Sequence, residues 1–359
     1  MKILFYINAI HQGGAERVIV NLVNQFSEKG EDVTLVTSFR DHWEYPVIDQ
    51  VKRCSFEEID FKKEGFLRQN IKWTLNLRKM IKEYAPDVVI SFMAEPNFRT
   101  ILAAAGLKAK RIISVRNDPN KEYPNFVYRI LAKVLYLFAD GIVFQTEDAK
   151  KWFSSFIQRK SEIIYNQVDR KFYACSNGGE TKGIVTCGRL VKQKNQAMLI
   201  DAFSEISDAV DENLYIYGEG ELRNNLEKQI KEKKLENRVF LPGDIKNVEE
   251  MLSKAALFVL PSDYEGMPNA LMEAMAVGVP CISTDCPCGG PLMLFHNEKE
   301  FLVEVGNKTE LAEKMKTVLL DKSKKEDNSK KMKAYSQEFT PERILKKWNE
   351  YVNEVVKNN

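Results

Sequence analysis

Two cations near the middle of the chain have the types and spacing to hold an anion. Arg189 and Lys194 follow a short apolar run at residues 183–187, and Gly188 opens the loop that carries them. Cations on a loop above the end of a strand are well placed to bind a diphosphate. Fixed cations also stabilise the negative charge that develops on a leaving nucleotide diphosphate. An ordinary solvated basic loop is the alternative.

A pair of carboxylates lies further along the chain, with Glu265 in a loop and Glu273 in a predicted helix over residues 269–277. Both can point to the carboxyl ends of strands, where α/β sheets bind ligands and where a carboxylate can accept hydrogen bonds from sugar and ribose hydroxyls. An unpaired Glu among apolar neighbours such as those of Glu273 is costly, so we favour ligand binding over a surface position. The turn between them offers backbone N–H groups to a hydroxyl or a phosphate; it consists of Gly266, Met267, Pro268 and Asn269.

A glycine pair, Gly13 and Gly14, comes directly after the first predicted strand and at the start of a helix. Glycines there let the backbone approach a ligand closely, and a helix N-terminus presents free N–H groups to an anion. The pair lacks the G-x-G-x-x-G spacing of a dinucleotide fingerprint, which argues against a nicotinamide-dependent oxidoreductase. A tight turn between strand and helix is the alternative.

A basic segment runs from Lys62 to Glu83. Its seven Lys and Arg residues outnumber its two Glu residues, and apolar side chains are interleaved among them. A helix of this kind can lie on anionic lipid or hold a diphosphate-linked acceptor. An ordinary surface helix with a basic outer face is an equal alternative.

The composition excludes several classes of protein. A net charge of +2 over 359 residues is too small for a nucleic-acid binder, and no apolar run reaches the ~20 residues of a transmembrane helix. The short apolar start does not fit a signal peptide, and the six scattered cysteines are typical of reduced thiols. We expect a cytoplasmic protein that can touch the inner face of the cell membrane without crossing it.

Known metal-binding and hydrolytic patterns are missing from the sequence. His11, His42 and His296 have no ligand or triad spacing, and Cys286 and Cys288 lack further ligands nearby. G-x-S-x-G, H-E-x-x-H and Walker A sequences do not occur, which argues against hydrolase, zincin and P-loop proteins. We therefore expect no metal and no cofactor.

Short β-branched runs alternate with longer helical segments, and this predicts an α/β fold with parallel sheets. The pattern runs twice, so we expect two Rossmann-like domains, with a helix over residues 219–234 in the second. The predicted strands cover residues 3–7, 33–37, 88–91, 111–115, 141–144 and 162–165 in the first half, and 183–187, 213–217, 238–241, 257–260 and 281–283 in the second.

The boundary between the halves falls near residues 166–169, before a polar, Gly-rich stretch that is typical of a linker. We predict a first domain over residues 1–167 and a second over residues 168–340. Residues 341–359 form an amphipathic helix whose apolar stripe must pack against one of the two domains.

Taken together and in this order, the early glycine pair, the loop with Arg189 and Lys194, and the Glu265–Glu273 pair resemble glycosyltransferase family 4. The resemblance covers essentially the whole chain, and the residues around Glu265 and Asp285 look most like bacterial members that assemble cell-surface polysaccharides or lipid-linked oligosaccharides. It implies a GT-B fold, in which two Rossmann-like domains face a cleft and the C-terminal helix crosses back to the first domain. It also implies retention of anomeric configuration without a metal.

The resemblance implies that residues 1–167 bind the acceptor and residues 168–340 the nucleotide sugar. Arg189 and Lys194 would hold the donor diphosphate, Glu265 and the turn after it the donor sugar, and Glu273 the ribose hydroxyls. The remaining donor-binding positions would be Gly13 and Gly14 from the first domain, Gly188, Gly218 and Gly220 on the nucleotide side, and Ile245 near the base.

One position departs from the family pattern. Related members often have a His in the loop after the fourth strand, where this chain has Arg116. Arg116 can instead meet an acceptor or donor phosphate; a surface Arg on a strand-end loop is the alternative.

We therefore predict a retaining, metal-independent glycosyltransferase. It would move a hexose or an N-acetylhexosamine from a nucleotide diphosphate, with UDP as the favoured carrier, to a glycan or lipid-linked saccharide. A nucleotide-sugar isomerase of the same fold and a non-catalytic nucleotide-sugar binder are the alternatives.

Overall fold

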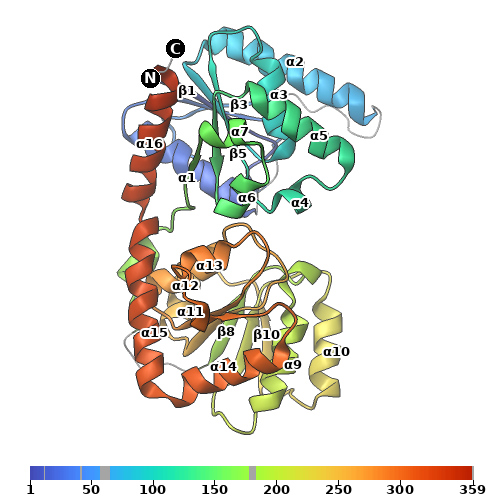
Figure 1. Ribbon diagram of the computed structural model, residues 1–359, viewed down its shortest axis with the longest axis vertical. Coiled ribbons are helices and arrows are strands. Elements are labelled where there is room, and N and C mark those ends of the chain that lie inside the picture. The colour runs from blue at the N-terminus through green and yellow to red at the C-terminus, as the bar shows by residue number, and fades with distance from the viewer. Residues whose placement is uncertain (12, 41–42, 57–64, 178–182, 358–359) are drawn as a thin grey trace. The chain divides into compact units, whose positions relative to one another are not determined.

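The computed structural model of the chain describes residues 1–11, 13–40, 43–56, 65–177 and 183–357. Contacts between Cα atoms divide the chain into two compact units (Figure 1). Unit 1 comprises Met1–Asn166 together with Glu342–Asn359, and unit 2 comprises Gln167–Pro341. Each unit is built on one parallel sheet, so the predicted pair of Rossmann-like domains is confirmed. None of the helices in the described part of the chain is long and apolar enough to cross a bilayer.

Unit 1 contains a seven-stranded sheet in the order β3-β2-β1-β4-β5-β6-β7. Its central strands are buried on both faces, as expected where helices cover both sides of a parallel sheet; Phe5 and Ile90, for example, are fully buried. The strands are β1 (Lys2–Ile7), β2 (Asp32–Thr37), β3 (Lys52–Ser55), β4 (Val88–Phe92), β5 (Lys110–Ser114), β6 (Gly141–Phe144) and β7 (Ser161–Ile163).

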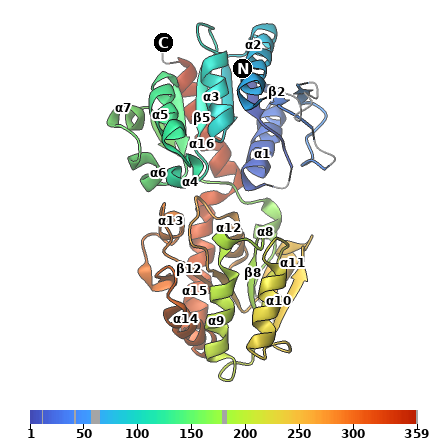
Figure 2. The ribbon, with the colours of Figure 1, turned by 90° about the vertical axis from the view of Figure 1, so that its right-hand side faces the viewer.

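Helices cover both faces of this sheet. α1 and α16 share one hydrophobic core with β1 and β4, while α2 and α3 pack on the opposite face. Figure 2 shows α3 between α2 and α5. The helices of unit 1 are α1 (Gly14–Glu28), α2 (Phe66–Tyr84), α3 (Ala94–Ala103), α4 (Pro119–Glu122), α5 (Phe126–Leu135), α6 (Glu147–Lys151), α7 (Ser155–Arg159) and α16 (Pro341–Lys357), with the 3₁₀ helix η1 (Tyr136–Phe138).

The C-terminal helix α16 belongs to the core of unit 1, which confirms the predicted return of the chain to the first domain. Trp348 is fully buried and stacks on Phe92 at a centroid distance of 5.9 Å. The Tyr351 hydroxyl accepts a hydrogen bond from the Ile142 N–H at 2.7 Å and donates one to the Lys160 carbonyl at 2.7 Å. These contacts bury the apolar stripe that the sequence predicts.

Unit 2 contains a six-stranded sheet in the order β10-β9-β8-β11-β12-β13, which repeats the strand order of unit 1 without its last strand. The strands are β8 (Ile184–Cys187), β9 (Leu214–Tyr217), β10 (Val239–Gly243), β11 (Leu257–Leu260), β12 (Cys281–Thr284) and β13 (Leu302–Val303). The helices are α8 (Arg170–Ala174), α9 (Gln196–Ile206), α10 (Arg223–Glu232), α11 (Val248–Ser253), α12 (Asn269–Val277), α13 (Gly290–Leu294), α14 (Lys308–Leu320) and α15 (Lys322–Tyr335), with the 3₁₀ helices η2 (Lys192–Lys194), η3 (Lys299–Phe301) and η4 (Ser336–Phe339).

The structure corrects the sequence prediction at a few elements. The helix predicted over residues 219–234 begins only at Arg223, because Gly218 and Gly220 have φ angles of 128° and 158°, which a helix does not use. Strands β3 and β13 were not predicted: β3 reads Lys-Arg-Cys-Ser and β13 has two residues. β3 has no apolar or alternating pattern, and β13, although apolar, is too short to mark a strand.

Candidate active site at the strand ends of unit 2

Two loops lie side by side at the carboxyl ends of the neighbouring strands β8 and β11. The Asp263 N–H donates to the Gln193 carbonyl at 2.8 Å, and the Gln193 side-chain amide donates to the Tyr264 carbonyl at 2.9 Å. The Asn195 amide donates to the Asp263 carboxylate at 2.7 Å. These bonds hold the loop with Lys194 against the loop with Glu265, although the two residues are 71 positions apart.

Lys194 and Glu265 form the central contact of this site. The Lys194 ammonium lies 2.6 Å from Glu265 Oε1, and the two side chains are 20% and 8% exposed. The buried Ser262 hydroxyl donates to the same oxygen at 2.7 Å. An ammonium has three N–H donors, so two remain for a further anion, and no described residue donates to Glu265 Oε2. The structure thus brings Lys194 and Glu265 into contact, whereas the binding roles of the predicted site residues stay predictions.

Arg189 lies on the same loop as Lys194 but is exposed. Its carbonyl accepts a hydrogen bond from the Gln196 side chain at 3.0 Å, which fixes the backbone. Within the described part of the chain no carboxylate pairs with its guanidinium. Arg189 therefore presents an unpaired guanidinium on the loop that also carries Lys194.

Glu273 is buried in the second turn of α12 among neighbours that are buried as well. The turn before the helix is also enclosed: Gly266, Met267 and Pro268 are buried, and Asn269 is half-buried. A Cβ atom on Gly290 would lie 1.9 Å from the Gly266 carbonyl oxygen, so α13 approaches this turn backbone to backbone. The turn is thus held rigidly beside the Glu265 carboxylate.

Three glycines let the strand-end loops of β8 and β9 touch. A Cβ atom on Gly218 would lie 2.1 Å from the Gly188 carbonyl oxygen, and one on Gly220 would lie 2.5 Å from the Leu190 carbonyl oxygen. The Leu190 N–H donates to the Glu219 carbonyl at 2.8 Å. Gly188 also leaves room for the Lys194 side chain, whose Cε would lie 3.5 Å from a Cβ there. These three glycines therefore allow the loops next to Lys194 to pack closely, backbone to backbone.

Ile245 lies in a different place from the charged residues. It lines an open hollow of about 690 Å³ between β9 and α11, together with Tyr215, Tyr217 and Met251 among others. None of Arg189, Lys194, Glu265 and Glu273 lines this hollow. Tyr215 and Tyr217 stack at 6.3 Å, so the hollow offers aromatic surface near the predicted base-binding residue.

Sequence reasoning missed two residues that contact the Glu265 carboxylate or its surroundings. Ser262 carries the hydroxyl that orients Glu265. Cys286 lies just after the end of β12, the strand that pairs with β11. Burial and the negative charge of Glu265 raise the pKa of the Cys286 thiol to about 12, so the thiol stays protonated. Neither residue has a motif that distinguishes it; only the pairing of β8, β11 and β12 brings them to one edge.

The glycine pair of unit 1 lies at the start of α1, as predicted. Gly13 is the N-cap and Gly14 is exposed. The Glu16 carboxylate lies against Gly13, because a Cβ there would be 1.8 Å from Glu16 Oε2. An anion that approaches Gly13 from this side must displace the Glu16 side chain.

Arg116 is buried at 9% exposure and has partners inside unit 1. Its guanidinium donates to the side chain of Asn166, the last residue of the first stretch of unit 1, and lies 4.4 Å from the Phe92 ring centroid. Burial lowers the pKa of Arg116 to about 9. Phe92 in turn stacks on Trp348 of α16. Arg116 thus contacts Asn166 directly and α16 only through Phe92. Its contact with a phosphate stays a prediction.

Glu122 is the acidic neighbour of Arg116. Its Oε2 accepts the backbone N–H groups of Arg116 at 3.1 Å and Asn117 at 3.0 Å. Its Oε1 is buried and has no hydrogen-bond partner among the described residues. Burial raises the pKa of Glu122 to about 7, so this carboxyl changes charge near neutral pH.

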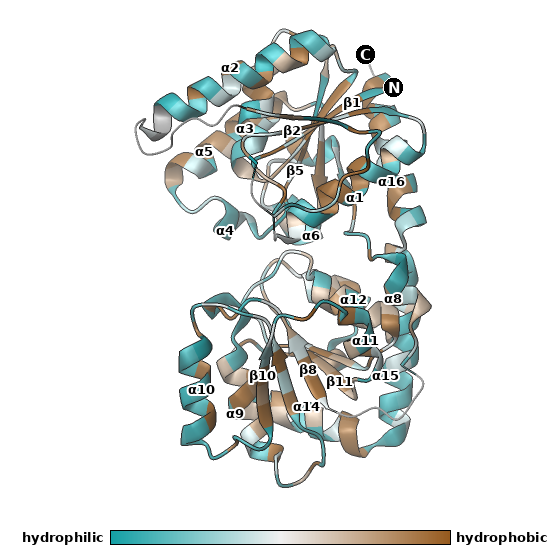
Figure 3. Cartoon of the chain, turned by 180° about the vertical axis from the view of Figure 1, so that it is seen from behind, coloured by the Kyte–Doolittle hydropathy of each residue, from teal (hydrophilic) through white to brown (hydrophobic). Residues whose placement is uncertain are grey.

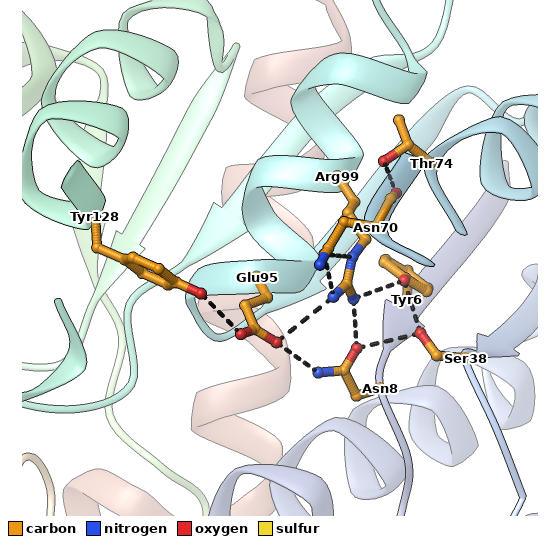
Figure 4. A network of polar contacts seen from close by, with 8 residues as sticks. All are labelled: Tyr6, Asn8, Ser38, Asn70, Thr74, Glu95, Arg99 and Tyr128. Carbon is orange, nitrogen blue, oxygen red and sulfur yellow. Dashed lines mark hydrogen bonds and ion pairs between the residues drawn. The ribbon is translucent and has the colours of Figure 1, made fainter. Parts of the chain in front are cut away.

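A second cation–carboxylate cluster lies in unit 1, at the carboxyl ends of β1, β2 and β4 (Figure 4). Arg99 donates to the Asn70 side-chain oxygen at 3.0 and 2.8 Å, to Asn8 at 2.5 Å and to the Tyr6 hydroxyl at 3.2 Å. Its guanidinium also lies 3.5 Å from the Glu95 carboxylate, which accepts a hydrogen bond from Tyr128 at 3.0 Å. No sequence motif indicated this network.

The basic segment from Lys62 to Glu83 is described only in part, because residues 57–64 lie outside the described residues. The described part is helix α2. Trp73, Leu77 and Ile81 pack into the core, whereas Ile71 and Leu75 are exposed. Lys72, Lys79 and Lys82 lie on the exposed side as well.

Comparison with known proteins gives the family. Residues 12–172 match the model "Glycosyltransferase Family 4", and residues 175–338 match the model "Glycosyl transferases group 1". A GalNAc-alpha-(1->4)-GalNAc-alpha-(1->3)-diNAcBac-PP-undecaprenol alpha-1,4-N-acetyl-D-galactosaminyltransferase of Campylobacter jejuni is 29% identical over 99% of both chains. An uncharacterized glycosyltransferase of Methanocaldococcus jannaschii is 32% identical over 70% of this chain and 68% of its own.

Among solved structures, Anabaena HepE in complex with UDP has a TM-score of 0.82 at 19% identity, over 99% of this chain and 100% of that chain. This likeness shows the shared fold. The two family models follow each other along nearly the whole sequence and match the two units in turn. From these matches and the relative at 32% identity, the chain belongs to glycosyltransferase family 4 and is a glycosyltransferase.

Proposed function

We propose that this glycosyltransferase moves a hexose or an N-acetylhexosamine from a UDP sugar to a glycan or lipid-linked saccharide, with retention of anomeric configuration and without a metal. The contact between Lys194 and Glu265 at the strand ends of unit 2 carries the proposal. The relatives support the substrate class, since the Campylobacter protein is named for transfer to an undecaprenol-diphosphate-linked saccharide and HepE binds UDP.

The donor diphosphate binds to Lys194 and Arg189 in this proposal. Two N–H donors of Lys194 remain after its bond to Glu265, and the exposed Arg189 supplies a bidentate guanidinium. Lys194 is held by Glu265 before the reaction, and together with Arg189 it would stabilise the leaving diphosphate without a bound metal. The donor-binding role of Gly13 and Gly14 in unit 1 stays a prediction, and a ligand at Gly13 would first have to displace the Glu16 side chain.

The donor sugar binds to Glu265 and the turn at Gly266–Asn269. Ser262 and Lys194 both occupy Oε1, which leaves Oε2 to accept sugar hydroxyls. Glu273 binds the ribose, and the base lies near Ile245, whose hollow has stacked Tyr215 and Tyr217 for a flat ring.

The acceptor hydroxyl attacks from the face that the diphosphate leaves. A diphosphate oxygen takes its proton, so no separate general base is needed. We place the acceptor on unit 1 beside Glu95, which is 36% exposed at the edge of the network in Figure 4 and can accept a hydroxyl hydrogen bond. A peripheral contact with the inner face of an anionic membrane belongs to the same proposal and would bring a lipid-linked acceptor within reach.

The proposal is tested by incubating the purified protein with UDP-linked hexoses and N-acetylhexosamines and measuring UDP release with and without undecaprenyl-diphosphate-linked saccharides. We expect acceptor-dependent release of UDP, a product of unchanged anomeric configuration by NMR, and full activity in excess EDTA. UDP sugars should also raise the melting temperature. Isomerised sugar without transfer would favour an isomerase, and a raised melting temperature without turnover would favour a binder; loss of activity in EDTA would disprove metal independence.

A further inference from the structure

An exposed apolar surface covers α5 and the adjoining η1 in unit 1. Phe126 is 76% exposed, Val127 62% and Phe138 59%. We define the α5 face as the exposed apolar residues of this segment, which are Phe126, Val127, Ile130, Leu131, Val134, Leu137 and Phe138. Phe156 of α7, which contacts η1, is exposed as well and extends the face.

The α5 face is apolar beyond what folding requires. The inner side of the segment packs through Ala132 and Tyr136, which are fully buried, and through Tyr128, which bonds Glu95. The apolar stripe on the other side has no partner among the described residues, and Figure 3 shows α5 as a largely hydrophobic helix at the surface of its unit. Contiguous exposed apolar patches on a domain mark interaction sites.

The charged residues within the segments that form the α5 face have one sign. The α5–η1 segment contains Arg129 and Lys133 and no acidic residue, and α7 with the residue after it contains Arg159 and Lys160 and no acidic residue. Arg129, Lys133 and Arg159 are exposed. The Lys133 ammonium lies 4.6 Å from the Trp152 ring centroid, which holds it beside the face.

We propose that the α5 face docks on a lipid bilayer that contains anionic headgroups. A helix with large apolar side chains on one side and basic residues along its flanks lies in the interface, with the apolar side in the acyl boundary and the cations at the headgroups. A second copy of this chain fits less well, because a two-fold contact would bring the cations of α5 and α7 together, and neither helix supplies an acidic partner.

This surface differs from the one that the sequence suggests. On α2, Ile71 and Leu75 are 52% and 59% exposed, and they stand one turn apart without further exposed apolar residues on the described part of that helix. Replacing Ile71 and Leu75 therefore provides a matched control for replacing Phe126 and Phe138, since each double substitution removes two large exposed side chains. The docking itself does not depend on the proposed sugar transfer, because it is measured without donor or acceptor.

The test measures sedimentation of the full chain with vesicles of phosphatidylcholine, with and without phosphatidylglycerol. We expect the protein to bind the vesicles that contain phosphatidylglycerol. The double variant Phe126→Ser, Phe138→Ser should bind at least about 10-fold more weakly, since each Phe contributes ~1.5 kcal/mol or more when buried. The control Ile71→Ser, Leu75→Ser should change binding by less than about twofold, and Arg129→Glu with Lys133→Glu should abolish the preference for phosphatidylglycerol.

Melting temperatures of all variants show that they fold, because the replaced side chains are exposed. Three outcomes would overturn the inference. The first is no binding to either vesicle. The second is a loss of binding in the α2 variant but not in the α5 variant. The third is a concentration-dependent dimer in gel filtration that Phe126→Ser, Phe138→Ser dissolves while vesicle binding is absent. UDP release with a soluble acceptor tests the proposed function separately.

Discussion

Both units hold a cation and a carboxylate at the carboxyl ends of strands in sheets of the same strand order, yet the two clusters differ in how many partners the cation has. In unit 1, Arg99 is 3% exposed and bonds Asn70, Asn8 and Tyr6 in addition to Glu95. In unit 2, Lys194 is 20% exposed, and the only hydrogen bond that the described residues accept from its ammonium is that to Glu265.

This difference separates a structural cation from one that can bind a ligand. Every nitrogen of the Arg99 guanidinium donates to a neighbour, so a ligand would have to break existing bonds. Lys194 keeps donors in reserve, and the exposed Arg189 lies on the same loop. The comparison predicts that changes at Arg99 reduce stability and changes at Lys194 reduce turnover.

The largest expected effect is on turnover in Lys194→Ala. Removal of one fixed donor to a developing charge costs about 10²–10³ in rate, so kcat for UDP release should fall by that factor while the melting temperature stays within a few degrees. Lys192→Ala is the matched control, because Lys192 is exposed in the same 3₁₀ turn. Near-normal turnover in Lys194→Ala would remove the contrast between the clusters.

The next effect is on stability in Arg99→Ala. The change removes the Arg99 donor from the half-buried side-chain oxygens of Asn70 and Asn8 and from the buried Tyr6 hydroxyl. We expect the free energy of unfolding to fall by about 3 kcal/mol in urea titrations. Arg78→Ala, which removes bonds only to the carbonyls of Ala103 and Ala105, should cost less. A stable Arg99→Ala protein with low activity would instead give Arg99 a direct role in binding.

Unit 1 also contains a buried carboxyl, that of Glu122, whose charge should make the stability of the protein depend on pH. The pKa of Glu122 in the folded state, about 7, lies above its value in the unfolded state, so the folded state binds the proton more tightly. This contribution to the free energy of unfolding is present at low pH and is lost as the pH rises from ~4.5 to ~7. Glu122→Gln cannot ionise, so its stability relative to the parent should rise across this window by roughly 2–3 kcal/mol. A difference that does not change with pH in urea titrations would contradict the raised pKa.

The smallest expected effect tests whether Glu265 needs its neighbour. In Ser262→Ala the Glu265 carboxylate loses the buried donor at 2.7 Å, and a hydrogen bond of this kind contributes ~1 kcal/mol. We expect kcat to fall about fivefold with little change in KM for the donor. A change in KM alone would show that Ser262 acts on donor binding, and no change in either would show that Lys194 alone orients Glu265.

Much of the unit 2 site can be predicted from sequence, because its residues follow apolar strands and stand beside glycines. Arg189, Lys194, Glu265 and Glu273 are recognised by type and position in the chain. The network around Arg99 cannot be predicted this way: Tyr6, Asn70 and Arg99 come from a strand and two helices, and none belongs to a motif. Arg116 shows the same limit, since its position after a strand suggests a ligand contact while its packing on Phe92 gives it internal partners.

The fold class and the division into two similar halves follow from the sequence, because they depend on the period of apolar residues and on glycine and proline. The apolar pattern of the last helix leaves open which domain it packs against, and only the family resemblance implies its return to the first domain. The sequence also determined which residues are cations and carboxylates at strand ends. Which of them bond to neighbouring residues and which keep free donors depends on the packed structure, because the hydrogen-bond partners follow strands that pair although they lie 70 or more residues apart in the chain. The packing likewise buries the apolar stripe of α16 and leaves that of α5 exposed, and this difference cannot be predicted from hydropathy alone.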